Sequence, residues 1–177
     1  MSFVRKAAAI CAAAVTLTLT GMTVNPAAAA PEAAPRPLMI RSVKVPTLVV
    51  DLSGGSSAQD TPAVLNLQAG GASQLWEVVP VQGDWFQLRN QASGTCLANG
   101  YHSVDNGHVL SGFPCIAEYE DQLWTRVGVA GANQFTLVNK YSGKCMDQSA
   151  LPLPRTQVTQ STCTGQAQQR WTATTVV

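Results

Sequence analysis

The sequence predicts an all-β fold built from three tandem repeats of about 47 residues. Three tryptophans, 48 and 47 residues apart, each follow a glutamine by two positions: Gln74-Leu75-Trp76, Gln122-Leu123-Trp124 and Gln169-Arg170-Trp171. A period of this length is typical of folds that repeat one supersecondary unit along the chain. Apolar and polar residues alternate ahead of the second and third motifs, which indicates strands with one buried face.

The second and third repeats share a longer pattern. Residues 86–90 followed by 93–97 (FQLRN, SGTCL) match residues 135–139 followed by 142–146 (FTLVN, SGKCM). The first repeat is weaker, because residues 47–51 (TLVVD) stand at the equivalent place and contain no cysteine. The predicted repeats therefore cover about 38–80, 81–128 and 129–177.

Turn signals separate the predicted strands. Asp105-Asn106-Gly107 is typical of a hairpin turn. Residues 115–127 are the one helical competitor, since their apolar residues could form a stripe. The equivalent stretch of the third repeat, 164–168, has no such stripe, so the repeat pattern favours non-helical structure here.

The N-terminus resembles a secretory leader. Arg5 and Lys6 precede an uncharged apolar stretch that runs to about residue 24, and Ala27-Ala28-Ala29 offers small residues for a signal peptidase. We expect a signal peptide over 1–29 and a Pro/Ala-rich lead-in over 30–37, with an uncleaved membrane anchor as the alternative. Cleavage would leave no membrane span in the mature chain and would remove Cys11, so that the cysteine count becomes even.

The charge composition limits the partners. Only 12% of residues are charged, and loss of Arg5 and Lys6 turns a net charge of +1 into −1. No basic surface for nucleic acid is therefore expected. The hydrophobic content of 46% also argues against a disordered chain.

The four remaining cysteines permit three pairings. The repeat symmetry selects Cys96–Cys115 and Cys145–Cys163, each closing a loop inside its own repeat. A zinc site is the rival, but no Cys-x-x-Cys spacing or suitably placed histidine supports it. Export and paired cysteines together predict a secreted, extracellular protein.

With three Gln-x-Trp repeats and Ser-Gly-Lys-Cys-Met-Asp in the best preserved one, residues 38–176 resemble the ricin B-chain type lectins. This resemblance implies a β-trefoil: three four-stranded units with pseudo-threefold symmetry. It makes Trp76, Trp124 and Trp171 core residues, with Gln74, Gln122 and Gln169 as hydrogen-bond partners of the backbone.

The resemblance also implies one shallow sugar pocket per repeat. In the family an Asp two places after the first cysteine accepts hydrogen bonds from sugar hydroxyls. An aromatic residue just before the second cysteine stacks on the ring, and an Asn or Gln near Gln-x-Trp completes the site. An ionised acceptor makes strong directional bonds, and an aromatic face covers C–H surface.

No repeat carries the full set. The second has the aromatic Phe113 and the acid Asp121, but Ala98 at the acceptor position, with Asn99 as a neutral substitute. The third has Asp147, Gln160 and Gln168 but Ser161-Thr162 where the ring is expected. The first has Asp51 but no ring.

Each of these residues also has a structural interpretation. Asp51 and Asp147 could bond turn amides, and Phe113 could pack on a disulfide. Tyr101, His102 and His108 could add a stacking or polar contact in the second repeat. The acidic group Glu118, Glu120 and Asp121 fits a solvated edge, because no calcium-loop signature accompanies it.

The sequence therefore predicts a secreted, lectin-like carbohydrate-binding module that recognises glycans weakly through non-standard pockets. The alternative is a degenerate trefoil that binds a protein partner, as an inhibitor or a toxin-associated subunit. No enzyme is expected, because the chain has two histidines and none of the common catalytic motifs. No cofactor or metal ion is expected either.

Overall fold

The computed structural model describes residues 36–148 and 150–176. The expected signal peptide and most of the expected lead-in lie outside these residues. The described part consists of strands joined by loops and short 3-10 turns, which confirms the all-β prediction. In this part no helix has the length and apolarity needed to cross a bilayer.

The strands fall into three groups, each containing one Gln-x-Trp motif. The first repeat holds β1 (Leu38–Ser42), β2 (Leu48–Leu52), β3 (Thr61–Leu67) and β4 (Trp76–Gln82). The second holds β5 (Trp85–Asn90), β6 (Cys96–Ala98), β7 (His108–Val109), β8 (Ser111–Phe113) and β9 (Trp124–Gly128). The third holds β10 (Phe135–Asn139), β11 (Cys145–Asp147), β12 (Thr159–Ser161) and β13 (Trp171–Thr175).

Each Gln-x-Trp motif has the same local structure. A 3-10 turn ends at the glutamine, over Ala72–Gln74, Glu120–Gln122 and Ala167–Gln169, and a strand begins at the tryptophan. Another 3-10 turn, Ser53–Gly55, follows β2. The helical competitor at 115–127 is therefore a loop, a single 3-10 turn and most of β9.

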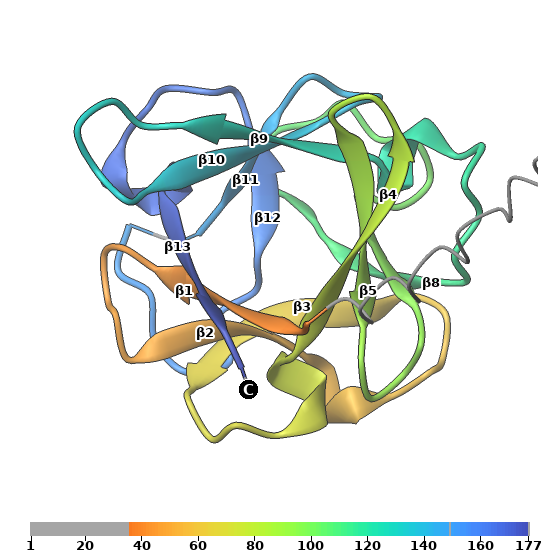
Figure 1. Cartoon of the computed structure of the whole chain (residues 1–177), viewed down its shortest axis with the longest axis horizontal. Helices are drawn as coiled ribbons and strands as arrows, with labels where there is room; N and C mark the ends of the chain where they lie inside the picture. The colour runs from red at the N-terminus through yellow and green to blue at the C-terminus, as the bar shows by residue number, and fades with distance from the viewer. Residues whose placement is uncertain (1–35, 149, 177) are drawn as a thin grey trace, which may run out of the picture. The chain divides into compact units, whose positions relative to one another are not determined.

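Six strands close into a barrel. The antiparallel pairs β1–β4, β4–β5, β5–β9, β9–β10, β10–β13 and β13–β1 return to the starting strand. The first and last strands run side by side, with five registered pairs from Leu38↔Thr175 to Ser42↔Trp171 (Figure 1). Closure of the barrel by the two ends of the domain leaves no open sheet edge there.

Three hairpins cap the barrel: β2–β3, β6–β8 and β11–β12. They are joined by a closed triangle of backbone hydrogen bonds. The Ala63 amide donates to the Leu110 carbonyl (2.8 Å), Leu110 donates to Val158 (2.9 Å), and Val158 donates to Ala63 (2.9 Å). One contribution from each repeat around a common centre gives the pseudo-threefold symmetry of a β-trefoil.

The core is centred on the three repeated tryptophans, which have no exposed surface. Each indole N–H donates to a backbone carbonyl in its own repeat: Trp76 to Val50 (3.0 Å), Trp124 to Leu97 (2.9 Å) and Trp171 to Met146 (3.2 Å). A buried indole needs such an acceptor. Apolar side chains from all three repeats, among them Ile40, Leu52, Leu88, Leu137 and Met146, fill the space around the rings.

The repeated glutamines fold the preceding loops back onto the barrel. Gln74, Gln122 and Gln169 are almost fully buried. Their side-chain amides donate to the carbonyls of Leu67, Pro114 and Thr162, and their oxygens accept from amides of the same loops. Both polar ends of each glutamine are therefore satisfied inside the fold.

The two disulfides join the pairs that the repeats select. Cys96–Cys115 and Cys145–Cys163 each close a loop within one repeat, with Cα atoms 5.0 Å apart. In the first repeat Val49 stands where the other repeats have Cys96 and Cys145, and it is buried in an apolar cluster with Met39 and Leu75.

Removal of one disulfide should lower stability without changing the fold. The double substitution Cys145→Ser with Cys163→Ser opens an 18-residue loop and should reduce the free energy of unfolding by about 3 kcal/mol, through the entropy gained by the unfolded chain. Urea unfolding monitored by tryptophan fluorescence measures this. The corresponding variant of the second repeat is the control, because its 19-residue loop predicts nearly the same loss. An unchanged midpoint in both variants would contradict the chain-entropy account.

Candidate functional site

The tryptophan hydrogen bonds identify three equivalent positions. The residue after each carbonyl acceptor is Asp51 in the first repeat, Ala98 in the second and Asp147 in the third. These positions are those at which the family resemblance places a sugar acceptor. The three repeats use them differently.

In the first repeat the acid is engaged by the protein. Asp51 is 6% exposed, and its Oδ2 accepts from Asn66 Nδ2 (3.1 Å) and Gln74 Nε2 (3.2 Å). Across the β2–β3 hairpin it pairs with the aliphatic Val64. Asp51 therefore acts mainly as a structural acceptor for the repeated glutamine.

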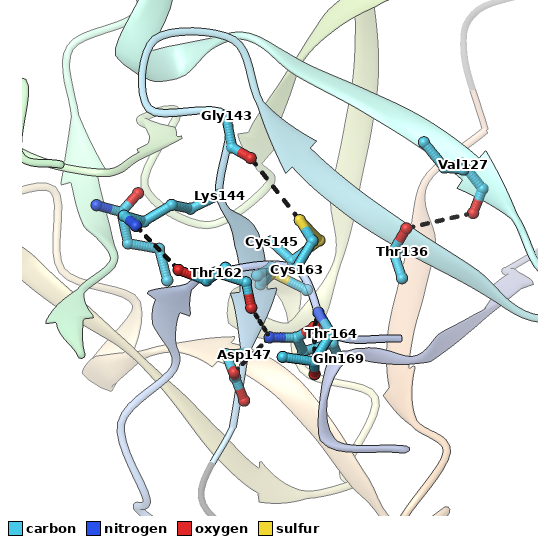
Figure 2. Close-up of a disulfide and its surroundings, with 12 residues drawn as sticks. Val127, Thr136, Gly143, Lys144, Cys145, Asp147, Thr162, Cys163, Thr164 and Gln169 are labelled. Atoms are coloured by element: carbon cyan, nitrogen blue, oxygen red, sulfur yellow. Dashed lines mark hydrogen bonds between the residues drawn. A yellow bond between two sulfur atoms is a disulfide. The ribbon is translucent and has the colours of Figure 1, made fainter. Parts of the chain in front are cut away.

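In the third repeat the acid is engaged in the same way but also borders a depression. Asp147 accepts from Gln169 Nε2 (2.8 Å) and from the Gln148 amide (2.6 Å). Figure 2 shows Asp147 facing Gln169 and Thr162 beside the Cys145–Cys163 disulfide. With Gln148, Thr156, Gln157, Thr159, Ser161 and Gln168 it lines an open depression of about 480 Å³ that has no aromatic wall.

Gln148 in this depression is unusual. The side chain is 3% exposed, and neither of its polar atoms has a hydrogen-bond partner among the described residues. A buried amide without a partner costs free energy.

The second repeat has a different pocket, which we name the aromatic depression. It has a volume of about 310 Å³ and is lined by Gln59, Tyr101, His102, Phe113, Pro114, Ile116, Tyr119, Asp121 and Gln122. Phe113 and Asp121, predicted from the sequence, therefore lie in one pocket. Ala98 stands at the family's acceptor position and offers no side-chain acceptor. Asp121, in the 3-10 turn of the Gln-x-Trp motif, supplies a carboxylate to the pocket instead.

The Asp121 carboxylate is held against the protein with unused acceptor capacity. The residue is 5% exposed, its Oδ1 has no hydrogen-bond partner among the described residues, and its Oδ2 lies 4.0 Å from His102 Nδ1. The Gln122 amide beside it differs from its counterparts in the other repeats, because without an acid at position 98 it donates only to the Pro114 carbonyl. The pocket thus offers both an acceptor and a donor.

Aromatic side chains form the wall of this depression. The Tyr101 and Phe113 rings meet edge to face, with centroids 5.7 Å apart. The ring centroid of His102 lies 6.0 Å from that of Tyr119 and 4.7 Å from that of Tyr141. Tyr101 and Tyr119 are exposed by 70% and 46%, so large ring surfaces are available to a ligand.

The loop that carries Tyr101 is backbone-strained. Gly100, Tyr101 and His102 have φ values of 59°, 51° and 55°, and the left-handed region is unfavourable for the two side-chain-bearing residues. Such strain persists only where the surroundings fix it. Here the Tyr101 hydroxyl donates to Asp60 of the first repeat, and this bond, reinforced by the negative charge of the carboxylate, raises the pKa of Tyr101 above its ordinary value.

Asn99 and Gln160 hold this loop from below. Both are fully buried, and both amides donate to the Ser103 carbonyl, at 3.0 and 2.9 Å. The Asn99 backbone amide also donates to the Asp121 carbonyl (3.0 Å), which ties the loop to the Gln-x-Trp turn. The sequence made both residues candidates for sugar contacts, but neither side chain lines the aromatic depression or the third-repeat depression.

The remaining candidates are distributed among the pockets. Phe113 and Asp121 lie together, Asp147 and Gln168 lie together, and Asp51 lies apart from both groups. Sequence reasoning missed Tyr119, whose signal was its place two residues before Asp121. Within the described residues no group of three or more His, Cys, Asp or Glu side chains is arranged to hold a metal ion.

The bond between Tyr101 and Asp60 can be tested by titration. Asp60→Asn should move the ionisation of Tyr101 to lower pH, because the carboxylate no longer favours the protonated phenol. In the native protein this bond contributes stability below the ordinary pKa of tyrosine and loses it as the pH rises through the raised value. Tyrosinate absorbance measures the shift, and Tyr101→Phe assigns it. Superimposable titrations of the wild type and Asp60→Asn would rule the bond out.

Comparison with known proteins agrees with this architecture. A family model, the ricin-type beta-trefoil lectin domain, matches residues 36–171. A search of curated proteins found no match.

Solved structures show the same fold at low sequence identity. ThreeFoil, a designed threefold-symmetric protein, has a TM-score of 0.75 and 20% identity, over 79% of this chain and 99% of its own. The Rhizoctonia solani agglutinin has a TM-score of 0.70 and 20% identity, over 83% of this chain and 100% of its own. An exo-β-1,3-galactanase from Clostridium thermocellum has a TM-score of 0.75 and 22% identity, over 82% of this chain. This chain spans only 31% of the galactanase. The chain therefore belongs to the ricin-type β-trefoil lectin domain family.

Proposed function

We propose that this protein is a secreted carbohydrate-binding module whose principal site is the aromatic depression of the second repeat. The observation that carries the proposal is that Asp121 lines one pocket together with the aromatic residues Tyr101, Phe113 and Tyr119. A carboxylate and aromatic rings are the two components of a sugar pocket. Here they come together although Ala98 has replaced the usual acid.

The chemistry of the pocket suits a neutral sugar. Asp121 Oδ2, the carboxylate oxygen on the side of His102, accepts a hydrogen bond from a sugar hydroxyl. The Gln122 amide donates to a second hydroxyl, and the exposed ring surfaces cover the C–H face of the sugar. In this proposal Asn99 is a positioning residue that fixes the loop.

The binding is weak and dominated by one pocket. The third-repeat depression offers Asp147, Gln148 and Gln168 but no ring, and the first repeat uses Asp51 inside the fold. Lectins with several equal pockets gain avidity from them, whereas one principal pocket gives only its own affinity. The two disulfides support a role outside the cytosol, where such bonds persist.

A protein-binding role is the alternative, and one surface feature favours it. Leu151 and Leu153, in the loop between β11 and β12, are 82% and 68% exposed. Exposed leucines close together in sequence are common at protein interfaces. Under this alternative Leu153→Ser would abolish binding of the natural partner. Substitutions in the aromatic depression would leave that binding unchanged.

Two substitutions test the principal site. Phe113→Ala removes part of the ring wall, and Asp121→Asn removes the charged acceptor while keeping its shape. Each should weaken glycan binding by about tenfold or more, because each removes a contact worth about 1.5 kcal/mol or more. Binding to galactose, xylan and cell-wall glycans is measured on an array and quantified by calorimetry.

Asp84→Asn is the matched control, since Asp84 is an exposed acid in the turn between β4 and β5. It should bind as the wild type does. Absence of binding by the wild type to every glycan, or undiminished binding by both site variants, would refute the proposed function.

A further inference from the structure

A second depression lies on the other side of Tyr101. It has a volume of about 340 Å³ and is lined by Asp60, Pro62, Gly100, Tyr101, His108, Val109, Ser111 and Gln157. We name it the cap depression, because its lining comes from the hairpins that cap the barrel. The sequence pattern of the family assigns no sugar contact to most of these residues, and only Tyr101 belongs to both depressions.

The cap depression forms where all three repeats meet. Pro62 of β3 pairs with Ser111 of β8, and Val64 of β3 forms a bridge with Gln157 ahead of β12. His108 of β7 pairs with Gln160 of β12. These pairings belong to the same cap that the Ala63–Leu110–Val158 triangle of backbone hydrogen bonds holds together.

Gly100 keeps the cap depression open toward Tyr101. A Cβ atom at this position would lie 3.3 Å from His108 Nε2 and 3.5 Å from Ser111 Oγ, and the backbone has a φ of 59°. Any other residue would be strained there, and its Cβ atom would crowd the His108 imidazole. With glycine present, the backbone passes close to His108 and Ser111 and leaves their polar atoms accessible.

The polar groups in the cap depression suit a chain rich in hydroxyls. Asp60 accepts from Tyr101 with one oxygen and retains a second oxygen as an acceptor. The imidazole of His108, the hydroxyl of Ser111 and the exposed amide of Gln157 supply further donors and acceptors. The lining has one acidic side chain and no lysine or arginine, which favours neutral hydroxyls over an anionic ligand.

Tyr101 stands between the two depressions as a shared wall. The residue is 70% exposed, and its ring rests edge to face on Phe113 in the aromatic depression. Its hydroxyl donates to Asp60 in the cap depression. Anchoring at both ends explains how the strained loop is held in place. It also places a preorganised ring at the point where a ligand would pass from one depression to the other.

We propose that the two depressions form one bipartite site, which binds a linear, neutral oligosaccharide with consecutive sugar units on either side of Tyr101. This proposal rests on the proposed function and adds the class of ligand: a stretch of glycan chain rather than a single terminal sugar. Gln157 also lines the third-repeat depression, so the path has a continuation for longer chains.

The test measures how the affinity depends on the length of the glycan, in the wild type and in variants of each depression. The probes are galactose, xylose and N-acetylglucosamine, each as the methyl β-glycoside and as linear β-linked chains of two to four units. Affinities are measured by calorimetry on the full mature chain. The cap variants are His108→Ala and Gln157→Ala. Gln82→Ala is the control, because Gln82 is an exposed glutamine that lines a separate depression.

In the wild type the disaccharide should bind at least fivefold more tightly than the matching monosaccharide. The cap variants should lose this gain and keep the affinity for the monosaccharide. Phe113→Ala should weaken both ligands, and Gln82→Ala should weaken neither.

Equal affinity for both lengths, or cap variants that behave as Gln82→Ala does, would overturn the bipartite site and leave the proposed function standing. Absence of binding to every probe would overturn both. A cap variant that weakens the monosaccharide as much as the disaccharide would also contradict the proposal, since the cap would then act on the aromatic depression itself.

Discussion

The fold and the site depend on one constraint, the hydrogen bond that each buried tryptophan must make. In every repeat the indole N–H donates to a strand carbonyl of the preceding hairpin. The residue that follows the accepting carbonyl is Asp51, Ala98 or Asp147. The bond fixes this residue beside the glutamine that precedes the tryptophan by two positions. Core packing and the position of the potential sugar acceptor are thus set by the same contact.

This coupling explains why the repeats diverge in function while keeping their structure. Where the acid is present, the repeated glutamine uses it as a hydrogen-bond partner, so part of its acceptor capacity is spent inside the fold. Where Ala98 replaces it, the Gln122 amide donates only to the Pro114 carbonyl of its loop, and the pocket's carboxylate comes from Asp121 instead. The second repeat therefore combines an under-used carboxylate with rings, although it is the repeat that lacks the usual acid.

The sequence was sufficient for the fold because its signals are repeated. The Gln-x-Trp spacing and the cysteine pattern each occur more than once, so the strands, the core tryptophans and both disulfides could be predicted. The site was harder to predict, because the directions in which its side chains point are not repeated from one repeat to the next. Asn99 and Gln160 have the right chemistry for sugar binding, but their amides point into the protein and hold the Ser103 carbonyl. The role of Tyr101 depends on a left-handed backbone and on a partner 41 residues away, and neither leaves a local pattern.

The most direct measurement is a crystal structure with a bound oligosaccharide, taken at several sugar concentrations. The account predicts that density for the first sugar to bind fills the aromatic depression, with a hydroxyl on Asp121 and a ring against Phe113 or Tyr119. Density that appears first beside Asp51 or Asp147, with the aromatic depression still filled by water, would contradict the central claim that the second repeat is the working site.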